Sequence, residues 1–146
     1  FHFRNREMLP AAMNSIHAAS PNASFTGSLE DTFSSAGVRL SKTSPFQLKI
    51  THYLLNQSQP SIITAGTPAT VTYSLSVTAE LRYHNQIIAT TSFSSSQPII
   101  QNINSLQATK AGPSLILQFQ NDIIEQIFLW MSSTDVKQKL RPNHAN

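Results

Sequence analysis

Hydrophobic and polar positions alternate strictly through the middle of the chain. Between residues 71 and 83 every odd position is hydrophobic, and most even positions are Thr or Ser. A period of two predicts a strand with one buried face, and this one is unusually long. His84 and Asn85 then predict a tight turn. Residues 87–93 return as the partner strand, and the polar, Pro-containing stretch 94–98 is expected to end it.

Two further segments are predicted to be strands. Residues 11–19 form a short one, and a second alternation covers residues 46–54. The buried face of this second strand is expected to hold its even positions, His52 and Leu54 included. His52 is therefore interpreted as a histidine at the edge of the core rather than as a ligand or a base.

Two segments show helical spacing instead. Phe25, Leu29 and Phe33 recur every four residues, which predicts a helix over residues 22–36 with Ser20 as its N-cap. A second helix is predicted to start near Pro113 and to end before residue 134. Its hydrophobic face holds Ile116, Phe119, Ile123, Ile127 and Trp130.

The predicted order is β-α-β-β-β-α, which favours an α+β fold. We expect a two-layer sandwich in which both helices pack on one face of a mostly antiparallel sheet of about four strands. Residues 1–134 are predicted to form this single domain, and residues 135–146 a polar, flexible tail. The other face of the sheet carries mainly Thr and Ser, so it is expected to be solvated or to contact something polar.

Composition narrows the possible functions. Only 12% of the residues are charged, about half the usual share near 25%. The net charge is +3, but the basic residues are scattered, which argues against a nucleic-acid partner. The sequence has no cysteine, which excludes a disulfide or a thiolate metal site within it. It also has no apolar run long enough to predict a membrane-spanning helix.

Motifs for catalysis are missing from the sequence. The five histidines show no metal-ligand spacing, and no nucleophile elbow or phosphate-binding glycine loop occurs. We therefore expect a protein that is not an enzyme and that needs no metal or cofactor. A small hydrolase with a site that the spacing does not reveal stays open as an alternative.

The opening Phe1-His2-Phe3-Arg4 resembles the start of the mature LPS-assembly lipoprotein family, LptE, in which a lipid-modified cysteine and a glycine come first. Because the chain opens on Phe rather than Met, we expect a segment ahead of it. The resemblance covers about residues 1–134. It continues through Pro21-Asn22, Ala36-Gly37-Val38, the alternating strand ending in Tyr83, and Ile124-Glu125-Gln126-Ile127.

This resemblance implies a lipoprotein on the periplasmic face of the outer membrane of a Gram-negative bacterium. Such a protein plugs the β-barrel LptD, helps to assemble it, and takes part in lipopolysaccharide insertion into the outer leaflet. A lipid anchor ahead of Phe1, His2, Phe3 and Arg4 would hold it at the membrane. Lys110 matches a basic position ahead of the last helix and would contact a lipid A phosphate. The alternative is a soluble periplasmic carrier or binding module for an apolar ligand.

Overall fold

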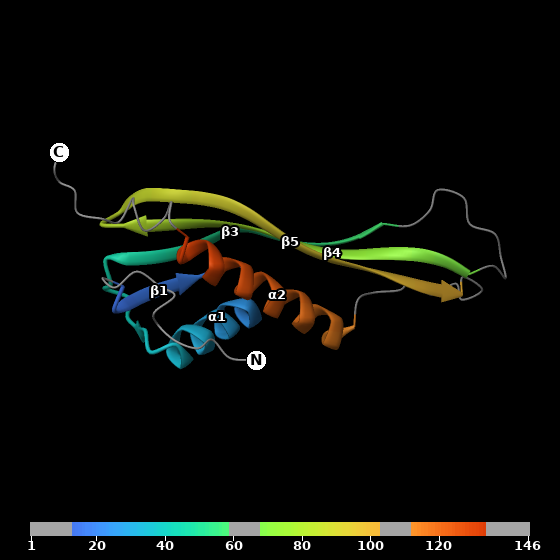
Figure 1. Ribbon diagram of the computed structural model, residues 1–146, viewed down its shortest axis with the longest axis horizontal. Coiled ribbons are helices and arrows are strands. Elements are labelled where there is room, and N and C mark those ends of the chain that lie inside the picture. The colour runs from blue at the N-terminus through green and yellow to red at the C-terminus, as the bar shows by residue number, and fades with distance from the viewer. Residues whose placement is uncertain (1–12, 59–67, 103–111, 134–146) are drawn as a thin grey trace.

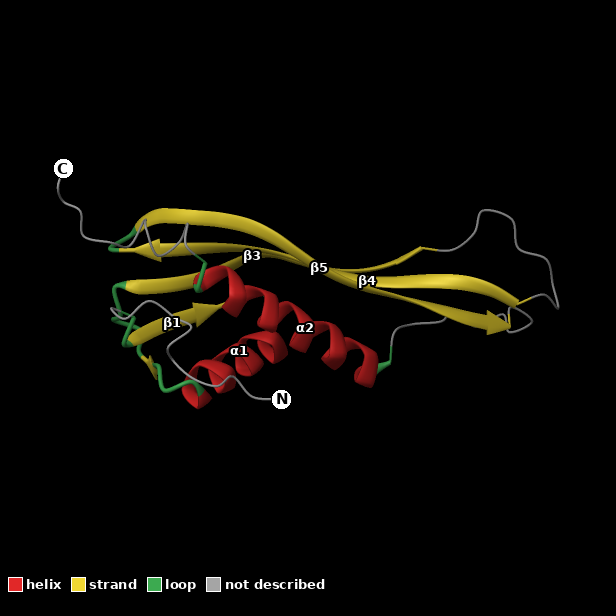
Figure 2. Cartoon of the chain, in the orientation of Figure 1, coloured by secondary structure: helices red, strands yellow, loops and turns green. Residues whose placement is uncertain are grey.

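The structure is a computed structural model that describes residues 13–58, 68–102 and 112–133. Seven elements follow one another in it: β1 (Ser15–Ala19), α1 (Ala23–Ser35), β2 (Arg39–Leu40), β3 (Phe46–Ser58), β4 (Pro68–Tyr83), β5 (Gln86–Asn102) and α2 (Pro113–Met131). Both helices lie on one face of the sheet, and the distal parts of β4 and β5 project beyond them (Figures 1 and 2). In these three segments, no helix combines the length and hydropathy needed to cross a bilayer.

The five strands form one sheet in the order β2-β1-β3-β4-β5. β1 is parallel to β2 and to β3, whereas β3, β4 and β5 are antiparallel neighbours. The predicted α+β class, with both helices on one face of a mostly antiparallel sheet, is confirmed. The additional strand, β2, has only two residues, which is too short to produce a periodic pattern in the sequence.

One hydrophobic core lies between the helices and the inner face of the sheet. The odd positions of β4 from Val71 to Leu81 are all buried, as the alternation predicted. The rings of Phe33 in α1 and Phe128 in α2 lie 4.8 Å apart and join the two helices. The other large side chains that are almost completely buried are Tyr73, Phe25, Phe119, Met13, Ile16, Leu29, Leu48, Leu75, Leu81 and Ile123.

The turn between β4 and β5 forms where it was predicted. His84 and Asn85 have φ angles of 53° and 64°, and these left-handed conformations suit a two-residue hairpin turn. The expected end of β5 at residues 94–98 was wrong, because the strand continues to Asn102. Pro98 is accommodated because β5 is the last strand of the sheet, where a missing N–H group can face away from the ladder.

The expected buried face of β3 was wrong beyond Ile50. A β-bulge between Ile50 and His52 shifts the register against β4, so the side chains that follow change faces. His52 and Leu54 are exposed on the outer side, and His52 is not an edge-of-core histidine. Tyr53 faces the helices instead, where its hydroxyl group accepts a hydrogen bond of 2.9 Å from the buried Gln120 side chain. The bulge thus buries an aromatic ring with a satisfied polar group rather than an imidazole.

The start of α1 also differs from the prediction. Its N-cap is Asn22, whose side chain accepts a hydrogen bond of 2.9 Å from the backbone N–H of Phe25. Ser20 lies before the helix, where its hydroxyl group donates to the carbonyl oxygen of Asn22 at 2.7 Å. The end of the helix agrees with the sequence, because Gly37 follows the C-cap with a φ of 87°.

Candidate functional site: an uncharged face of the sheet

The distal parts of the three long strands contain no Asp, Glu, Lys or Arg. This region, which we call the uncharged ribbon, comprises residues 51–58 of β3, 68–79 of β4 and 90–102 of β5. Its inner face packs partly against α2, where Gln118 donates to Gln97 and Ser95 donates to Asp122, both at 3.0 Å. Its outer face is turned away from the helices.

Hydroxyl and amide side chains cover most of this outer face. The register of the strands aligns four rows across it: His52–Thr78–Ser92, Leu54–Ser76–Ser94, Asn56–Ser74–Ser96 and Ser58–Thr72–Pro98. The hydroxyl groups of Thr78 and Ser92 hydrogen-bond across the strands at 3.0 Å. Ser76, Ser94 and Ser96 are exposed. Each hydroxyl group can both donate and accept, so the face can match many arrangements of polar groups on a partner.

Charged side chains on the same sheet lie closer to the β4–β5 turn. The guanidinium group of Arg82 forms an ion pair of 3.1 Å with Glu80. Lys49 is the β3 neighbour of Glu80 in the register, and it is exposed. The sheet therefore changes from a charged surface to an uncharged one along its own strands.

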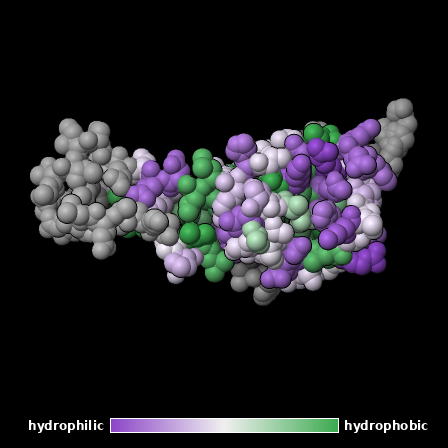
Figure 3. Space-filling view, turned by 180° about the vertical axis from the view of Figure 1, so that it is seen from behind, coloured by the Kyte–Doolittle hydropathy of each residue, from purple (hydrophilic) through white to green (hydrophobic). Residues whose placement is uncertain are grey.

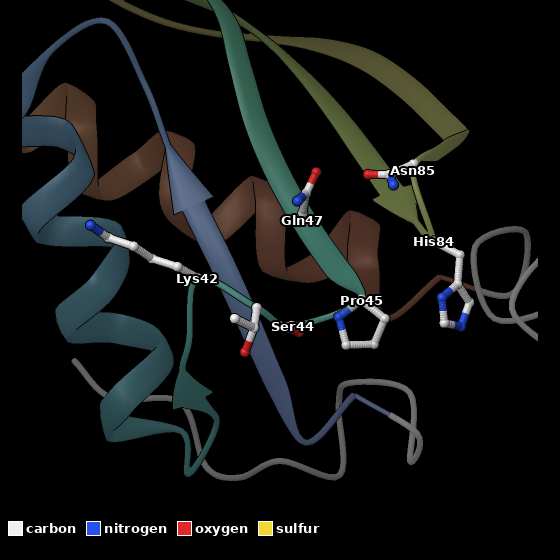
Figure 4. A pocket seen from close by; sticks show the side chains of 7 residues that line it. Lys42, Ser44, Pro45, Gln47, His84 and Asn85 are labelled. Atoms are coloured by element: carbon white, nitrogen blue, oxygen red, sulfur yellow. The ribbon is translucent and has the colours of Figure 1, made fainter.

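A polar pocket of about 420 Å³ lies at the charged end of the sheet. Lys42, Ser44, Pro45, Gln47, His84 and Asn85 line it together with Thr43. Figure 4 shows that the Lys42 ammonium group extends toward α1 and away from His84, which lies on the opposite side. These side chains do not converge on one point.

Within the described segments, no group of three or more His, Asp or Glu side chains lies close enough to hold a metal ion. His17, His52 and His84 belong to three different strands or turns.

Several residues singled out from the sequence belong to segments that the structure does not describe. Phe1, His2, Phe3, Arg4 and Lys110 lie outside the described residues. The roles assigned to them therefore remain predictions. The uncharged ribbon was only partly anticipated. The sequence predicted that the outer face of the sheet carries Thr, Ser, Glu80 and Arg82, but it did not predict a separate uncharged region in which three strands align. The long interval between Arg82 and Lys110 without a charged residue was the available signal.

Comparisons with known proteins identify the fold. No protein-family model matches the chain, and no curated protein matches it in sequence. Several solved structures are similar, and two of them share the fold over most of their length. The uncharacterized lipoprotein B of Nitrosomonas europaea has a TM-score of 0.66 at 18% identity, with 99% of each chain covered. A minor lipoprotein of Acinetobacter baumannii has a TM-score of 0.63 at 17% identity, covering 82% of this chain and 93% of the other. The chain therefore shares its fold with these two bacterial lipoproteins.

Proposed function

We propose that this protein is a non-enzymatic outer-membrane lipoprotein that plugs a β-barrel of the LptD type and takes part in inserting lipopolysaccharide into the outer leaflet. The observation that carries this proposal is the uncharged ribbon, whose outer face presents rows of hydroxyl and amide groups. The shared fold with two bacterial lipoproteins supports the lipoprotein part. The resemblance of Phe1-His2-Phe3-Arg4 to the start of the LptE family supports the choice of partner.

The ribbon is suited to the inside of a barrel for an electrostatic reason. Barrel lumens are polar, and a plug must give up its hydration when it enters one. Removing water from a charge is costly unless a partner of opposite charge is in place. Ser76, Ser94 and Asn56 instead need only hydrogen bonds, which a polar wall can supply in many arrangements.

The lipid anchor and the lipopolysaccharide contact are further parts of the proposal. A lipid-modified cysteine ahead of Phe1 would anchor the protein to the membrane. Lys110 would pair with a lipid A phosphate, because an ammonium group forms charge-assisted hydrogen bonds with phosphate oxygens. Lys110→Glu tests this contact separately from the barrel contact, since the residue lies outside the ribbon.

Recovery of the partner from the native membrane tests the proposal. The full-length gene with a C-terminal tag is expressed in its own host, outer membranes are extracted in mild detergent, and proteins bound to the tag are identified by mass spectrometry. We expect an LptD-like barrel in stoichiometric amount. The double variant Ser76→Glu/Ser94→Glu should recover about tenfold less barrel, because two carboxylates would be desolvated at the contact.

A matched control uses the same kind of substitution elsewhere. Ser24 is exposed near the start of α1, and Ser24→Glu should recover as much barrel as the unchanged protein. Recovery of the unchanged protein without any barrel, or equal recovery by the double variant, contradicts the plug. Recovery from the soluble periplasm with a bound apolar molecule would favour the carrier instead.

A further inference from the structure

The sheet has a vacant strand position beside β3. β1 pairs with β3 only from His17↔Gln47 to Ala19↔Lys49. The chain then turns at Ser20 and Pro21 toward the N-cap of α1, because proline cannot donate to a ladder. Among the described residues, no strand pairs with this side of β3 from Ile50 to Ser58.

The backbone groups that face the vacancy can be identified from β5. In an antiparallel sheet each residue directs its N–H and C=O groups to one side, and the side alternates along the strand. Gln126 of α2 donates to the carbonyl oxygen of Ser94 at 3.1 Å, and Pro98 has no N–H group to offer. Both observations indicate that the backbone N–H and C=O groups at the even positions of β5 point to its free edge.

The same alternation extends across the sheet to β3. Even positions of β5 lie opposite even positions of β4. Because the backbone groups at these positions of β5 point away from β4, the backbone groups at the even positions of β4 form their hydrogen bonds with β3. Their partners on β3 are the even positions 52–58. Consistently, the Thr51 hydroxyl group contacts the carbonyl oxygen of Thr78 at 3.4 Å. The N–H and C=O groups of Tyr53, Leu55 and Gln57 therefore face the vacancy.

The vacancy begins at an open pocket. A pocket of about 410 Å³ lies between the end of β1 and β3, in line with the course of β1. Its lining residues are Ala19, Ser20, Pro21, Lys49, Ile50 and Thr51. A strand that continued the direction of β1 along β3 would pass through this pocket.

Two exposed leucines flank the vacancy. Leu54 on the outer face is 55% exposed, and Leu55 on the inner face is 38% exposed. Figure 3 shows hydrophobic side chains gathered in a band on the narrow part of the molecule, between the body and the tip of the ribbon. A strand added beside β3 would cover apolar surface on both of its faces while it satisfied the backbone groups.

We propose that an extended segment of a partner protein adds to the sheet at this position, pairing with residues 51–58 of β3. The segment is uncharged along the ribbon and carries a carboxylate at the end near Lys49, which is exposed and has no ion-pair partner among the described residues. This goes beyond the proposed function, because a closed barrel has no edge strand to donate.

Charge distinguishes such a partner from a second copy of the chain. The free edges of β3 and β5 in the uncharged ribbon contain no carboxylate. A copy that paired through either edge would bring no carboxylate to Lys49, whose cross-strand neighbour Glu80 is already ion-paired with Arg82. A partner segment with an acidic end supplies one.

Photo-crosslinking in the full-length protein in its own host tests the proposal. p-Benzoyl-phenylalanine is placed at Leu54, Leu55 or Asn56, and the linked peptides are sequenced by mass spectrometry. We expect all three positions to link to one short segment of one partner. Leu54 and Asn56 should reach residues two apart in it, and Leu55 the residue between, because faces alternate along a strand. The probe at Ile87, which is 52% exposed on β5, should not link to this segment.

Two proline variants on opposite edges provide a matched comparison. Leu55→Pro removes an N–H group that faces the vacancy, and Ile100→Pro removes one that faces the free edge of β5. Neither substitution takes a hydrogen bond from the β4 ladders. With the probe at Leu54, Leu55→Pro should lower the crosslink yield about tenfold, whereas Ile100→Pro should leave it unchanged.

Other results would overturn the proposal. They are crosslinks to a second copy of the chain, links scattered over several partner segments, or equal yields with both proline variants. If Leu55→Pro does not accumulate as folded protein, Lys49→Glu replaces it. Lys49→Glu should lower the same yield by repelling the carboxylate of the segment, and an unchanged yield then contradicts the proposal.

Discussion

The strands β3, β4 and β5 run through both the uncharged ribbon and the part of the sheet near the β4–β5 turn, which we call the body together with the helices. The outer face of the sheet carries charged side chains in the body and none in the ribbon. Near the β4–β5 turn, Lys49, Glu80 and Arg82 lie on the outer face. Farther along the same strands, hydroxyl and amide groups replace every charge. The inner face of β4 does not change in this way, because it stays buried from Leu81 to Val71.

This difference indicates that the inner face determines the stability of the fold, whereas the outer face is available for interactions. The buried inner face holds the sheet against the helices wherever the helices cover it, so it sets the fold. The outer face contributes little to the core and is free to differ between the two regions. Substitutions on the two faces should therefore have effects of different size on unfolding, and the predictions below test that separation.

The largest effect is expected from the core of the body. Phe33 is completely buried, and its ring lies 4.8 Å from that of Phe128. Phe33→Ala should lower the free energy of unfolding by about 3–5 kcal/mol, because it removes an aromatic side chain and leaves a cavity. Urea denaturation measures the change. Leu54→Ala, at an exposed site, serves as the control, and an equal loss there would contradict the separation.

A smaller effect is expected where α2 meets the inner face of the ribbon. Gln120 is only 2% exposed and donates to the Tyr53 hydroxyl group at 2.9 Å. Gln120→Ala should lower the free energy of unfolding by about 1–3 kcal/mol, because it removes a buried amide and leaves the partly buried Tyr53 hydroxyl group without this partner. Tyr53→Phe completes a double-mutant cycle. Strictly additive losses would show that the two side chains are not coupled.

The N-cap of α1 should contribute less again. Asn22 accepts a hydrogen bond of 2.9 Å from the backbone N–H of Phe25 and is the N-cap of the helix. Asn22→Ala should lower the free energy of unfolding by about 1 kcal/mol. Ser24→Ala, two residues into the same helix, is the matched control. If both variants lose the same amount, the cap has been assigned to the wrong residue.

The smallest effect on unfolding is expected on the outer face of the ribbon. Ser76 is exposed between Leu54 and Ser94, and neither neighbour is charged. Ser76→Glu should therefore change the free energy of unfolding by less than about 0.5 kcal/mol. Thermal denaturation of the purified variant measures it. A loss as large as that of Phe33→Ala would mean that this face is part of the folded core after all.

Much of the fold could be predicted because periodicity reports burial. The alternation in β4 and the four-residue spacing in α1 each arise from one face packing on the core, and both segments lie where they were expected. The hairpin turn was predicted from His84 and Asn85, whose local conformations depend on few other residues. These features are local, so a single sequence contains them.

The errors have a different origin, because they depend on contacts between distant residues. The sequence near Thr51 does not indicate the β-bulge in β3. That bulge turns Tyr53 toward Gln120, a residue far along the chain, with which it forms a hydrogen bond. Likewise a proline usually ends a strand. β5 continues past Pro98 only because it lies at the edge of the sheet. The candidate surface was only partly anticipated for the same reason, since three strands must be aligned before their hydroxyl groups form rows.

The absence of charge on the ribbon has a consequence for ionic strength. Dissolved salt screens interactions between charges, whereas hydrogen bonds between neutral groups and buried apolar surface respond to it only weakly. A complex formed through Ser76, Ser94 and their neighbours should therefore have nearly the same affinity in dilute and in concentrated salt. Such a complex would therefore stay assembled through large changes in the ionic strength of its surroundings.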